Sequence, residues 1–342
     1  MINVKRMDNV KLSSRSLVTK YQQITDSIIH DIECGKLSKG DKLPSVNEFS
    51  AILKVSRDTI EKAYKQLKEL RYIVAISSKG YYISGKNTRI LKILFVVNKL
   101  SFYKKVVYEN LVAQLGAKAT IDLCVHHYRL DLFKKIIEQK NGQYHYYLVM
   151  PHFESGISKK DCIKTLKTIQ ESELILIDKD IPELGKKRRG VVQDFSTDIY
   201  NAFTDNHKLI NKYKNIVLVM NQPNHHPTEI QLGIAKYCLE NKKSTKVIND
   251  INSAVLRKKT LYVFTFESDL AIMIKKVRQS SLELGEDIGV LSFNETIFKE
   301  LLGISVVSTD FKMMGEFAAD IILNRASGVI HNPFKFIDRG SI

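Results

Sequence analysis

The sequence has little that would place it in a membrane or outside the cell. Among its 342 residues there is no long uncharged apolar run of the kind that spans a bilayer. Residues 1–15 are polar and lack the apolar stretch of a secretory signal. We therefore expect a protein without membrane segments that is located in the cytoplasm.

Cysteine is scarce as well. The four cysteines, Cys34, Cys124, Cys162 and Cys238, lie far apart, and no C-x-x-C pair occurs. This spacing argues against a disulfide framework and against a zinc site, and it favours reduced, mostly buried thiols.

The common motifs of nucleotide-binding proteins and hydrolases are also missing. No Walker loop, no G-x-S-x-G and no G-x-G-x-x-G is present. The adjacent pairs at 126–127 and 225–226 are histidines, but neighbouring side chains on a strand point apart, which disfavours a shared metal. The basic run at 186–189 reads as a solvated loop. We expect no metal, no cofactor and no catalytic residues.

Positive charge, in contrast, is abundant and unevenly distributed. The formal net charge is +16, and residues 1–90 hold 17 Lys and Arg against 9 Asp and Glu. The first quarter of the chain thus carries half of the excess. This concentration favours a polyanionic partner for the N-terminal segment.

Residues 19–84 show the alternation of a helix-turn-helix. Apolar residues at helical spacing predict helices at about 19–34, 45–53 and 57–70, and two strands follow at 72–76 and 80–83 around a short turn. Ser56 can cap the third helix. Residues 1–18 show no periodicity and are predicted to be an arm.

The motifs of this segment resemble the winged helix-turn-helix of the GntR family. They are Tyr21-Gln22-Gln23-Ile24, Gly35-Lys36-Leu37, Gly40-Asp41-Lys42-Leu43-Pro44-Ser45, Val55-Ser56-Arg57-Asp58-Thr59 and Ala63-Tyr64-Lys65-Gln66-Leu67. Two positions depart from the usual pattern, Val46-Asn47 and Glu61, so the resemblance predicts no operator sequence. It implies binding to double-stranded DNA through the second and third helices and the wing. The residues implied are Ser45, Asn47, Ser56, Arg57, Thr59, Lys62, Lys79 and Gly80.

After a polar linker at 85–90 the pattern changes to an α/β one over residues 91–342. Apolar runs are predicted to be strands at 91–97, 146–150, 174–177, 216–220, 261–264 and 288–293. Helices are predicted at about 105–115, 158–171, 196–212, 228–241, 250–258 and 268–284. Buried strands alternating with amphipathic helices indicate parallel sheets covered on both faces, and the length favours two lobes.

This second part resembles the effector domain of LacI-type repressors, which is similar to periplasmic sugar-binding proteins. The resemblance rests on Ile93–Asn98, Leu174–Lys179, Gly233–Ala235, Gly285–Phe293 and Val306–Asp310. A GntR head on a LacI-like body is the arrangement of arabinose-repressor-type regulators. It implies a homodimeric transcription regulator, a repressor, whose operator affinity is controlled by a small molecule such as a monosaccharide.

A ligand is expected at the carboxyl ends of the strands, where the two lobes face each other. Side chains there that could bind a hydroxyl-rich ring are Asn98, Ser101, Phe102, Tyr103, His152, Asp178, Lys179, Asp194, Glu229, Glu267 and Asn294. Asp194 and Glu267 could instead be helix caps. An arginine that the LacI pattern leads one to expect near Gly233 is missing.

Three alternatives remain open at this point. The body could serve only for dimerisation, with a degenerate cleft. The chain could be a sugar-binding protein without a role on DNA, which the N-terminal motifs disfavour. It could also be an enzyme fused to a GntR head, as in aminotransferase-like regulators, but the body is short for that and shows no recognisable cofactor-lysine motif.

Overall fold

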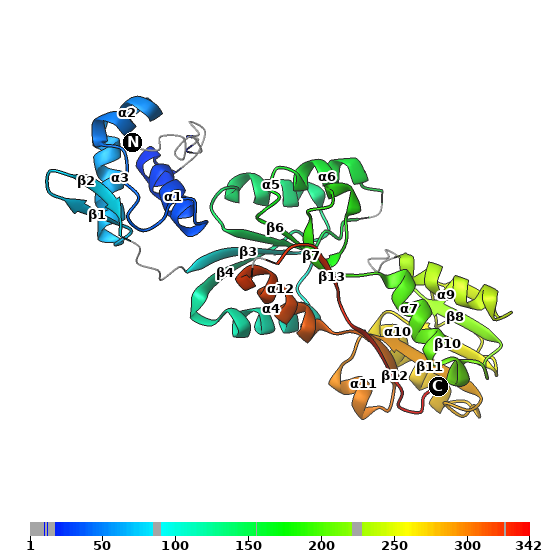
Figure 1. Ribbon diagram of the computed structural model, residues 1–342. Helices are drawn as coiled ribbons and strands as arrows, with labels where there is room; N and C mark the ends of the chain where they lie inside the picture. Colours follow the sequence, from blue (N-terminus) through cyan, green and yellow to red (C-terminus); the bar gives the residue numbers. More distant parts are fainter. Residues whose placement is uncertain are drawn as a thin grey trace. The chain divides into compact units, whose positions relative to one another are not determined.

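The computed structural model describes residues 10, 12, 18–84, 90–154, 156–220, 228–324 and 326–342. The chain divides into two compact units, one of residues 1–92 and 117–120 and the other of residues 93–116 and 121–342 (Figure 1). We call residues 18–84 the head and residues 90–342 the body. The predicted linker at 85–90 lies, apart from Ile90, outside the described residues. So does most of the predicted arm, although Val10 is buried in the core of the head.

The head is a three-helix unit followed by a hairpin. Its elements are α1 (Lys20–Glu33), α2 (Val46–Leu53), α3 (Arg57–Glu69), β1 (Ile73–Ile76) and β2 (Gly80–Ile83). Each begins and ends within one residue of its predicted bound. The helices pack because apolar residues recur every three or four positions, so that Ile24, Ile28, Phe49, Ile60 and Leu67 become fully buried. The hairpin is antiparallel and pairs Ile73 with Ile83.

Two serines begin the second and third helices of the head. Ser45 forms a capping box with Glu48, in which each side chain accepts a hydrogen bond from the other residue's backbone N–H. Ser56 Oγ accepts from the backbone N–H of Thr59 at 3.2 Å. The turn between α2 and α3 contains Lys54 in the left-handed region, with φ of 52°. These local signals explain why the helix starts could be predicted.

The first lobe of the body contains a six-stranded sheet in the order β13-β7-β6-β5-β3-β4. The strands are β3 (Leu91–Val97), β4 (Ala119–Val125), β5 (Tyr146–Val149), β6 (Leu174–Lys179), β7 (Arg189–Gln193) and β13 (Val329–His331). The lobe's helices are α4 (Phe102–Leu115), α5 (Leu130–Lys140), α6 (Lys159–Leu166) and α12 (Phe311–Asn324). The pairs from β3 through β5, β6 and β7 to β13 are parallel.

The second lobe repeats this plan with the order β14-β12-β11-β10-β8-β9. Its strands are β8 (Asn215–Val219), β9 (Ser244–Ile248), β10 (Thr260–Phe264), β11 (Ile288–Phe293), β12 (Ser305–Thr309) and β14 (Phe334–Ile337). Its helices are α7 (Phe195–Asp205), α8 (His207–Ile210), α9 (Glu229–Glu240), α10 (Glu267–Arg278) and α11 (Ile297–Leu301). Only β14 is antiparallel to its neighbour among the pairs described. The α/β fold with parallel sheets is as predicted.

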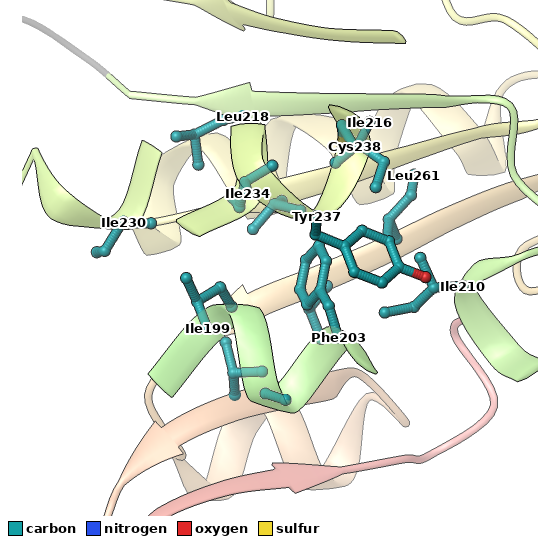
Figure 2. Packing of buried hydrophobic residues seen from close by; sticks show 14 of the residues in the cluster. Ile199, Phe203, Ile210, Ile216, Leu218, Ile230, Ile234, Tyr237, Cys238 and Leu261 are labelled. Atoms are coloured by element: carbon teal, nitrogen blue, oxygen red, sulfur yellow. The ribbon is translucent and has the colours of Figure 1, made fainter. Parts of the chain in front are cut away.

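One apolar core fills the space between α7, α9 and the second sheet. Ile199 and Phe203 from α7 meet Ile234 and Tyr237 from α9 over the strands (Figure 2). The rings of Phe203 and Tyr237 lie edge to face with centroids 5.4 Å apart. This core holds the start of α9 beside the carboxyl ends of the strands.

The chain crosses between the two lobes three times, after β7, after β12 and after β13. Asn332 ties these crossings together, because its buried side-chain amide donates to Gln193 Oε1 at 2.7 Å and to the Asp310 carbonyl at 3.2 Å. We call Gln193, Asp310 and Asn332 the hinge cluster. It joins the lobes at the side of the strand ends.

Several predicted elements are wrong or incomplete. Residues 250–258 form a loop rather than a helix, because Asp250 accepts from the backbone N–H groups of Asn252 and Ser253 and closes a turn. The long helix predicted at 196–212 is broken between α7 and α8. Strands β4, β7, β9, β12, β13 and β14 and helices α5 and α12 were not predicted. The edge strands β4 and β9 are largely exposed and do not form continuous apolar runs. Strands β7 and β12 are buried, but polar residues at both ends interrupt their apolar runs.

The basic run at 186–189 is only partly a solvated loop. Arg188 forms an ion pair with Asp180 at 2.7 Å, and Arg189 begins β7 and is buried. In the part of the chain that the structure describes, no helix is long and apolar enough to cross a membrane, and no group of three or more potential metal ligands occurs.

Candidate functional site

The outer face of α3 carries several exposed charged residues. Ile60, Ala63, Tyr64 and Leu67 point into the core, so the opposite face is left to charged residues. Arg57 lies 3.7 Å from Glu61, and Lys62 lies 2.7 Å from Asp58. Both are exposed pairs one helical turn apart. Such pairs contribute little to stability, and their cations can be redirected to phosphate or base edges at small cost.

The predicted DNA-binding residues lie on three elements of the head. Ser45 and Asn47 are exposed at the start of α2, and Lys79 and Gly80 are exposed at the turn of the β1–β2 hairpin. Thr59 is half-buried, and its hydroxyl lies 2.8 Å from Ser56 Oγ. Ser45 and Ser56 therefore also have structural roles as caps, and Thr59 is bonded to the Ser56 cap. Arg57, Lys62 and Lys79 are the predicted cations that remain exposed on this surface.

The body contains a cavity of about 480 Å³ at the carboxyl ends of the strands, which we call the cleft. It is lined from both lobes. The residues after β3 and at the start of α4 contribute Asn98, Lys99, Ser101, Phe102, Tyr103 and Lys104, and the rest of the first lobe contributes Tyr128, His152, Asp178 and Phe311. The second lobe contributes Phe195, Ile230, Thr265, Phe266, Glu267, Phe293, Asn294, Thr296, Ile297, Phe298, Lys299 and Thr309.

Eight of the eleven predicted ligand residues lie around this cleft, and three do not. Lys179 and Glu229 form an ion pair with each other at 3.7 Å, from the end of β6 to the start of α9. Asp194 is the cap of α7 and accepts from the backbone N–H and the hydroxyl of Thr197. Glu267, the other suspected cap, does line the cleft, and its helix has no side-chain cap.

A buried ionic cluster forms one wall of the cleft. Asp178 Oδ2 accepts from Lys104 Nζ at 3.1 Å and lies 2.9 Å from His152 Nε2. All three side chains are about nine-tenths buried. Burial alone would raise the pKa of Asp178, but the Lys104 ammonium and His152 hold it well below its usual value. The carboxylate is therefore neutralised by the protein itself.

A second buried cation stands on the opposite wall. Lys299 is 3% exposed and donates to the carbonyls of Phe293 and Asn294, both at 2.8 Å. Burial lowers its pKa, while Glu267, 3.4 Å away, acts in the other direction. All three of its partners lie within the cleft lining.

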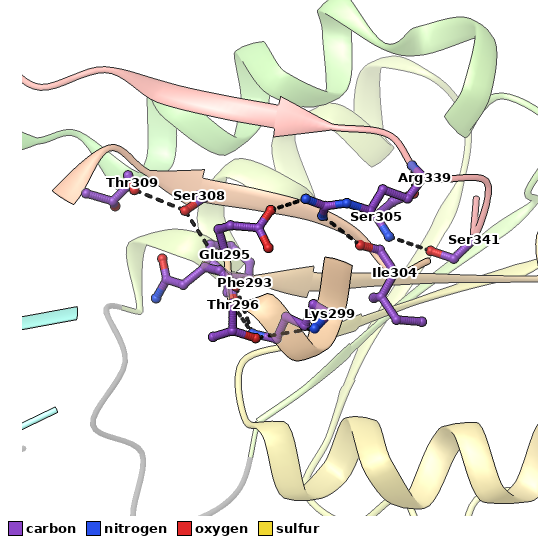
Figure 3. Close-up of polar contacts among 11 residues, drawn as sticks. Phe293, Glu295, Thr296, Lys299, Ile304, Ser305, Ser308, Thr309, Arg339 and Ser341 are labelled. Atoms are coloured by element: carbon purple, nitrogen blue, oxygen red, sulfur yellow. Dashed lines mark hydrogen bonds and ion pairs between the residues drawn. The ribbon is translucent and has the colours of Figure 1, made fainter. Parts of the chain in front are cut away.

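The loop that carries Asn294 is fixed by neighbouring strands (Figure 3). The backbone N–H of Glu295 donates to Ser308 Oγ at 3.0 Å, and Arg339 holds the Glu295 carboxylate at 2.5 Å. Asn294 has φ of 63°, and its backbone N–H donates to the Val307 carbonyl. This left-handed residue follows the end of β11 and lines the cleft.

Aromatic rings make up much of the remaining lining. Tyr103 and Phe311 are stacked with centroids 5.0 Å apart and planes 23° from parallel. Phe102 meets Tyr103 edge to face. Burial raises the pKa of Tyr103, so its hydroxyl stays protonated and can donate. Such a wall can cover the C–H face of a ring while polar groups bind its substituents.

Sequence reasoning missed several lining residues. Thr265 directly follows β10 and Lys99 lies two residues after β3, so the strand-end rule would have found both. Thr309 is the last residue of β12, a strand that was not predicted. Lys104 and Lys299 gave no such signal, because each lies within or beside a helix and only its tertiary partners show that it is buried.

His126, beside the cleft, offers a test of the body's pH dependence. Its Nε2 must carry the proton, because the Met150 carbonyl 3.1 Å away can only accept. No hydrogen-bond partner of Nδ1 occurs among the described residues. Burial lowers the pKa of His126 to about 4. When the pH falls below 6.5, the usual pKa of histidine, His126 is protonated in the unfolded chain but stays neutral in the folded chain. The free energy of unfolding therefore decreases as the pH falls from 6.5 towards 4.

We expect the wild type to lose about 2 kcal/mol more unfolding free energy between pH 7.5 and 5.0 than His126→Gln. Glutamine keeps a donor for Met150 but cannot titrate, and the other histidines contribute equally to both proteins. Urea unfolding at the two pH values measures the difference. Equal losses would show that His126 is protonated normally in the folded chain.

Comparison with known proteins finds different relatives for the head and for the body. Residues 20–83 match the family of bacterial regulatory proteins, gntR family. The HTH-type transcriptional repressor YtrA of Bacillus subtilis is 35% identical over 75 residues, which are 22% of this chain and 58% of YtrA. The mannosyl-D-glycerate transport/metabolism system repressor MngR of Escherichia coli is 28% identical over 223 residues, 55% of this chain and 93% of MngR. The chain thus spans less than two thirds of YtrA.

The body is similar to solved structures of repressors. The Lac repressor dimer bound to operator and the anti-inducer ONPF matches with a TM-score of 0.60 at 12% identity, over 75% of this chain and 95% of that one. Identity this low shows the fold alone. The chain carries the DNA-binding domain of the gntR family at residues 20–83, joined to a body with the two-lobed fold of LacI-type repressors.

Proposed function

We propose that this protein is a transcription regulator, a repressor, whose affinity for a DNA operator is controlled by a sugar-type small molecule bound in the cleft. The proposal is carried by one observation: a gntR-type head and a cleft of about 480 Å³ between two LacI-like lobes occur in the same chain. The relatives that match the head are named transcriptional regulators and repressors, not enzymes.

The DNA side of the proposal rests on the exposed charges of the head. In a helix-turn-helix the first turn of the recognition helix enters the major groove. Arg57 lies in that first turn of α3 and Lys62 in the next turn, and Lys79 stands at the hairpin turn, where a wing reaches the backbone. Two-fold operators are bound by two-fold proteins, so we propose a homodimer. A role on DNA places the protein in the cytoplasm.

The ligand side rests on the composition of the cleft. Amide, hydroxyl and charged groups alternate with aromatic rings, which suits a ring that carries hydroxyl groups. The name of MngR concerns mannosyl-D-glycerate, a sugar derivative, and the Lac repressor structure holds the anti-inducer ONPF. We propose that the lobes open and close around the ligand about the hinge cluster of Gln193, Asp310 and Asn332. The ligand changes operator affinity only if it binds one lobe arrangement better than the other.

The first test measures operator binding. An operator is selected from a random-sequence library by the wild-type chain, and affinity is measured by fluorescence anisotropy. Arg57→Ala should bind about 10- to 100-fold more weakly, because a lost base or phosphate contact of this kind is worth about 1–3 kcal/mol. Arg278→Ala, at an exposed arginine on α10 of the body, is the matched control and should bind as the wild type does. Full affinity in Arg57→Ala would show that the recognition helix is misassigned.

The same assay tests ligand control. A panel of neutral and acidic monosaccharides is titrated into the wild-type complex with its operator. At least one compound should change operator affinity about 5-fold or more, the usual size of an allosteric coupling. If the whole panel leaves affinity unchanged, ligand control fails and the body is a dimerisation module.

A further inference from the structure

The charges that line the cleft are not balanced. Its acidic side chains are Asp178 and Glu267, and each is held by a buried lysine, Lys104 at 3.1 Å and Lys299 at 3.4 Å. The Asp178 carboxylate is also in contact with His152, whose Nε2 lies 2.9 Å from Oδ2. The remaining charged residue of the lining is Lys99, so the cleft has one positive charge more than its own carboxylates neutralise.

The Lys99 ammonium group lines the cleft and is available to pair with a negatively charged group of a ligand. Lys99 lies two residues after β3, next to Asn98, and is half-buried. Among the residues that the structure describes, none forms an ion pair or hydrogen bond with its ammonium group. Burial lowers its pKa, and repulsion from Lys104 lowers it further, so the two ammonium groups are close enough to interact. An anion at this point would relieve both effects.

The neighbouring residue specifies a second feature of the ligand. Asn98 is 5% exposed and lines the cleft, and its Oδ1 has no hydrogen-bond partner within the described chain. A buried carbonyl oxygen without a donor is costly, and a ligand hydroxyl would satisfy it. The stacked rings of Tyr103 and Phe311 offer a flat apolar surface in the same cavity.

We propose that the ligand of the cleft is an acidic sugar, whose carboxylate or phosphate pairs with Lys99 and whose hydroxyl donates to Asn98. This inference rests on the proposed function, since it assumes that the cleft holds a small ligand. It goes further by excluding neutral sugars as the preferred class. Asp178 does not oppose an anion here, because Lys104 and His152 already neutralise it.

The test uses matched sets of sugars on the full chain. Glucose, glucose 6-phosphate and glucuronate, and the corresponding galactose and mannose sets, are compared by thermal unfolding and titration calorimetry, with inorganic phosphate as a separate arm. An acidic member should raise the melting temperature while its neutral counterpart at equal concentration does not. The phosphate and carboxylate arms tell the two sources of negative charge apart.

Variants then assign the effect to Lys99. Lys99→Met should bind the acidic sugar about 10- to 100-fold more weakly, because a charge-assisted contact is lost, and Lys99→Arg should retain most of the affinity. The control is Lys105→Met, which removes an equal charge from the exposed side of α4, where Lys105 pairs with Glu109. It should bind as the wild type does.

Three results would overturn the inference. The first is equal binding of neutral and acidic sugars. The second is an unchanged affinity of Lys99→Met for the acidic sugar. The third is the absence of stabilisation by every acidic sugar of the panel. A neutral sugar that binds and releases the operator would refute the acidic ligand and leave the proposed function intact. If the wild-type chain without ligand binds no operator, the proposed function is refuted instead.

Discussion

Asp178→Asn should lower the free energy of unfolding of the body by about 3–5 kcal/mol at pH 7, the usual cost of removing one partner from a buried ion pair. Lys104 would keep its charge while only a tenth of its side chain is exposed, and His152 would face a neutral amide. The size of the effect is set by the cost of leaving the buried Lys104 ammonium without a counter-charge, and not by the attraction within the pair.

The effect should depend on pH in a defined direction. The pKa of Asp178 is held below its ordinary value of 3.8, so the carboxylate stabilises the fold above that pH, and the contribution is lost as the pH falls through the folded-state pKa. The difference between wild type and Asp178→Asn should therefore shrink below about pH 4.

Two further variants test the cause. Lys104→Met combined with Asp178→Asn should recover part of the lost stability, because no buried charge is left unpaired. Asp131→Asn is the exposed counterpart: Asp131 pairs with Arg129 at 2.5 Å, but both side chains are more than half exposed, and the loss should stay below about 1 kcal/mol. Equal losses in Asp178→Asn and Asp131→Asn would contradict the assigned role of burial.

Gly233→Val should destabilise the second lobe by about 3 kcal/mol or more, at the upper end of what overpacking costs. A Cβ atom at position 233 would lie 2.3 Å from Ile199 Cγ2 and 2.3 Å from the Ser196 carbonyl oxygen. The carbonyl belongs to the backbone of α7 and cannot turn aside, so α7 and α9 must separate. Glycine within a helix costs about 1 kcal/mol in propensity, and the contact outweighs that cost here.

Urea unfolding of Gly233→Val and Gln231→Val measures this effect. Gln231 is exposed on the same helix, so its replacement by valine changes helix propensity by only about 0.5 kcal/mol and creates no clash. Gly233→Ala, with the smallest possible side chain, should already be less stable than the wild type. A Gly233→Ala protein more stable than the wild type would show that α7 and α9 are not in close contact.

Prediction from the sequence was accurate where local signals decide the structure. In the head, Ser45 and Ser56 cap helices through their own neighbours, and Gly35 follows the end of α1, so every bound was within one residue. Six of the eight buried strands of the body were recognised because their runs are continuously apolar. The other two, β7 and β12, are equally buried but contain polar residues at both ends. The edge strands β4 and β9 carry no such run, and their pairing depends on distant partners.

The candidate site was predictable in outline only. Strand ends located the cleft, and eight of the proposed residues lie around it. Lys179, Glu229 and Asp194 are at strand or helix ends too, but they bond to each other or to their own helix. Whether a charged side chain faces a cavity or another side chain is settled by contacts that no local pattern contains.

The sequence by itself determined the head, the α/β character of the body and the edge of the sheets where a ligand would lie, because helix caps, hydrophobic spacing and strand ends are local properties. Only the tertiary structure decided which charges are paired. Lys104 and Asp178 are 74 positions apart, and their contact leaves Lys99 as the cation of the cleft that lacks a partner in the described chain. Electrostatic balance depends on distance and burial in space, so it emerges only when the lobes have folded.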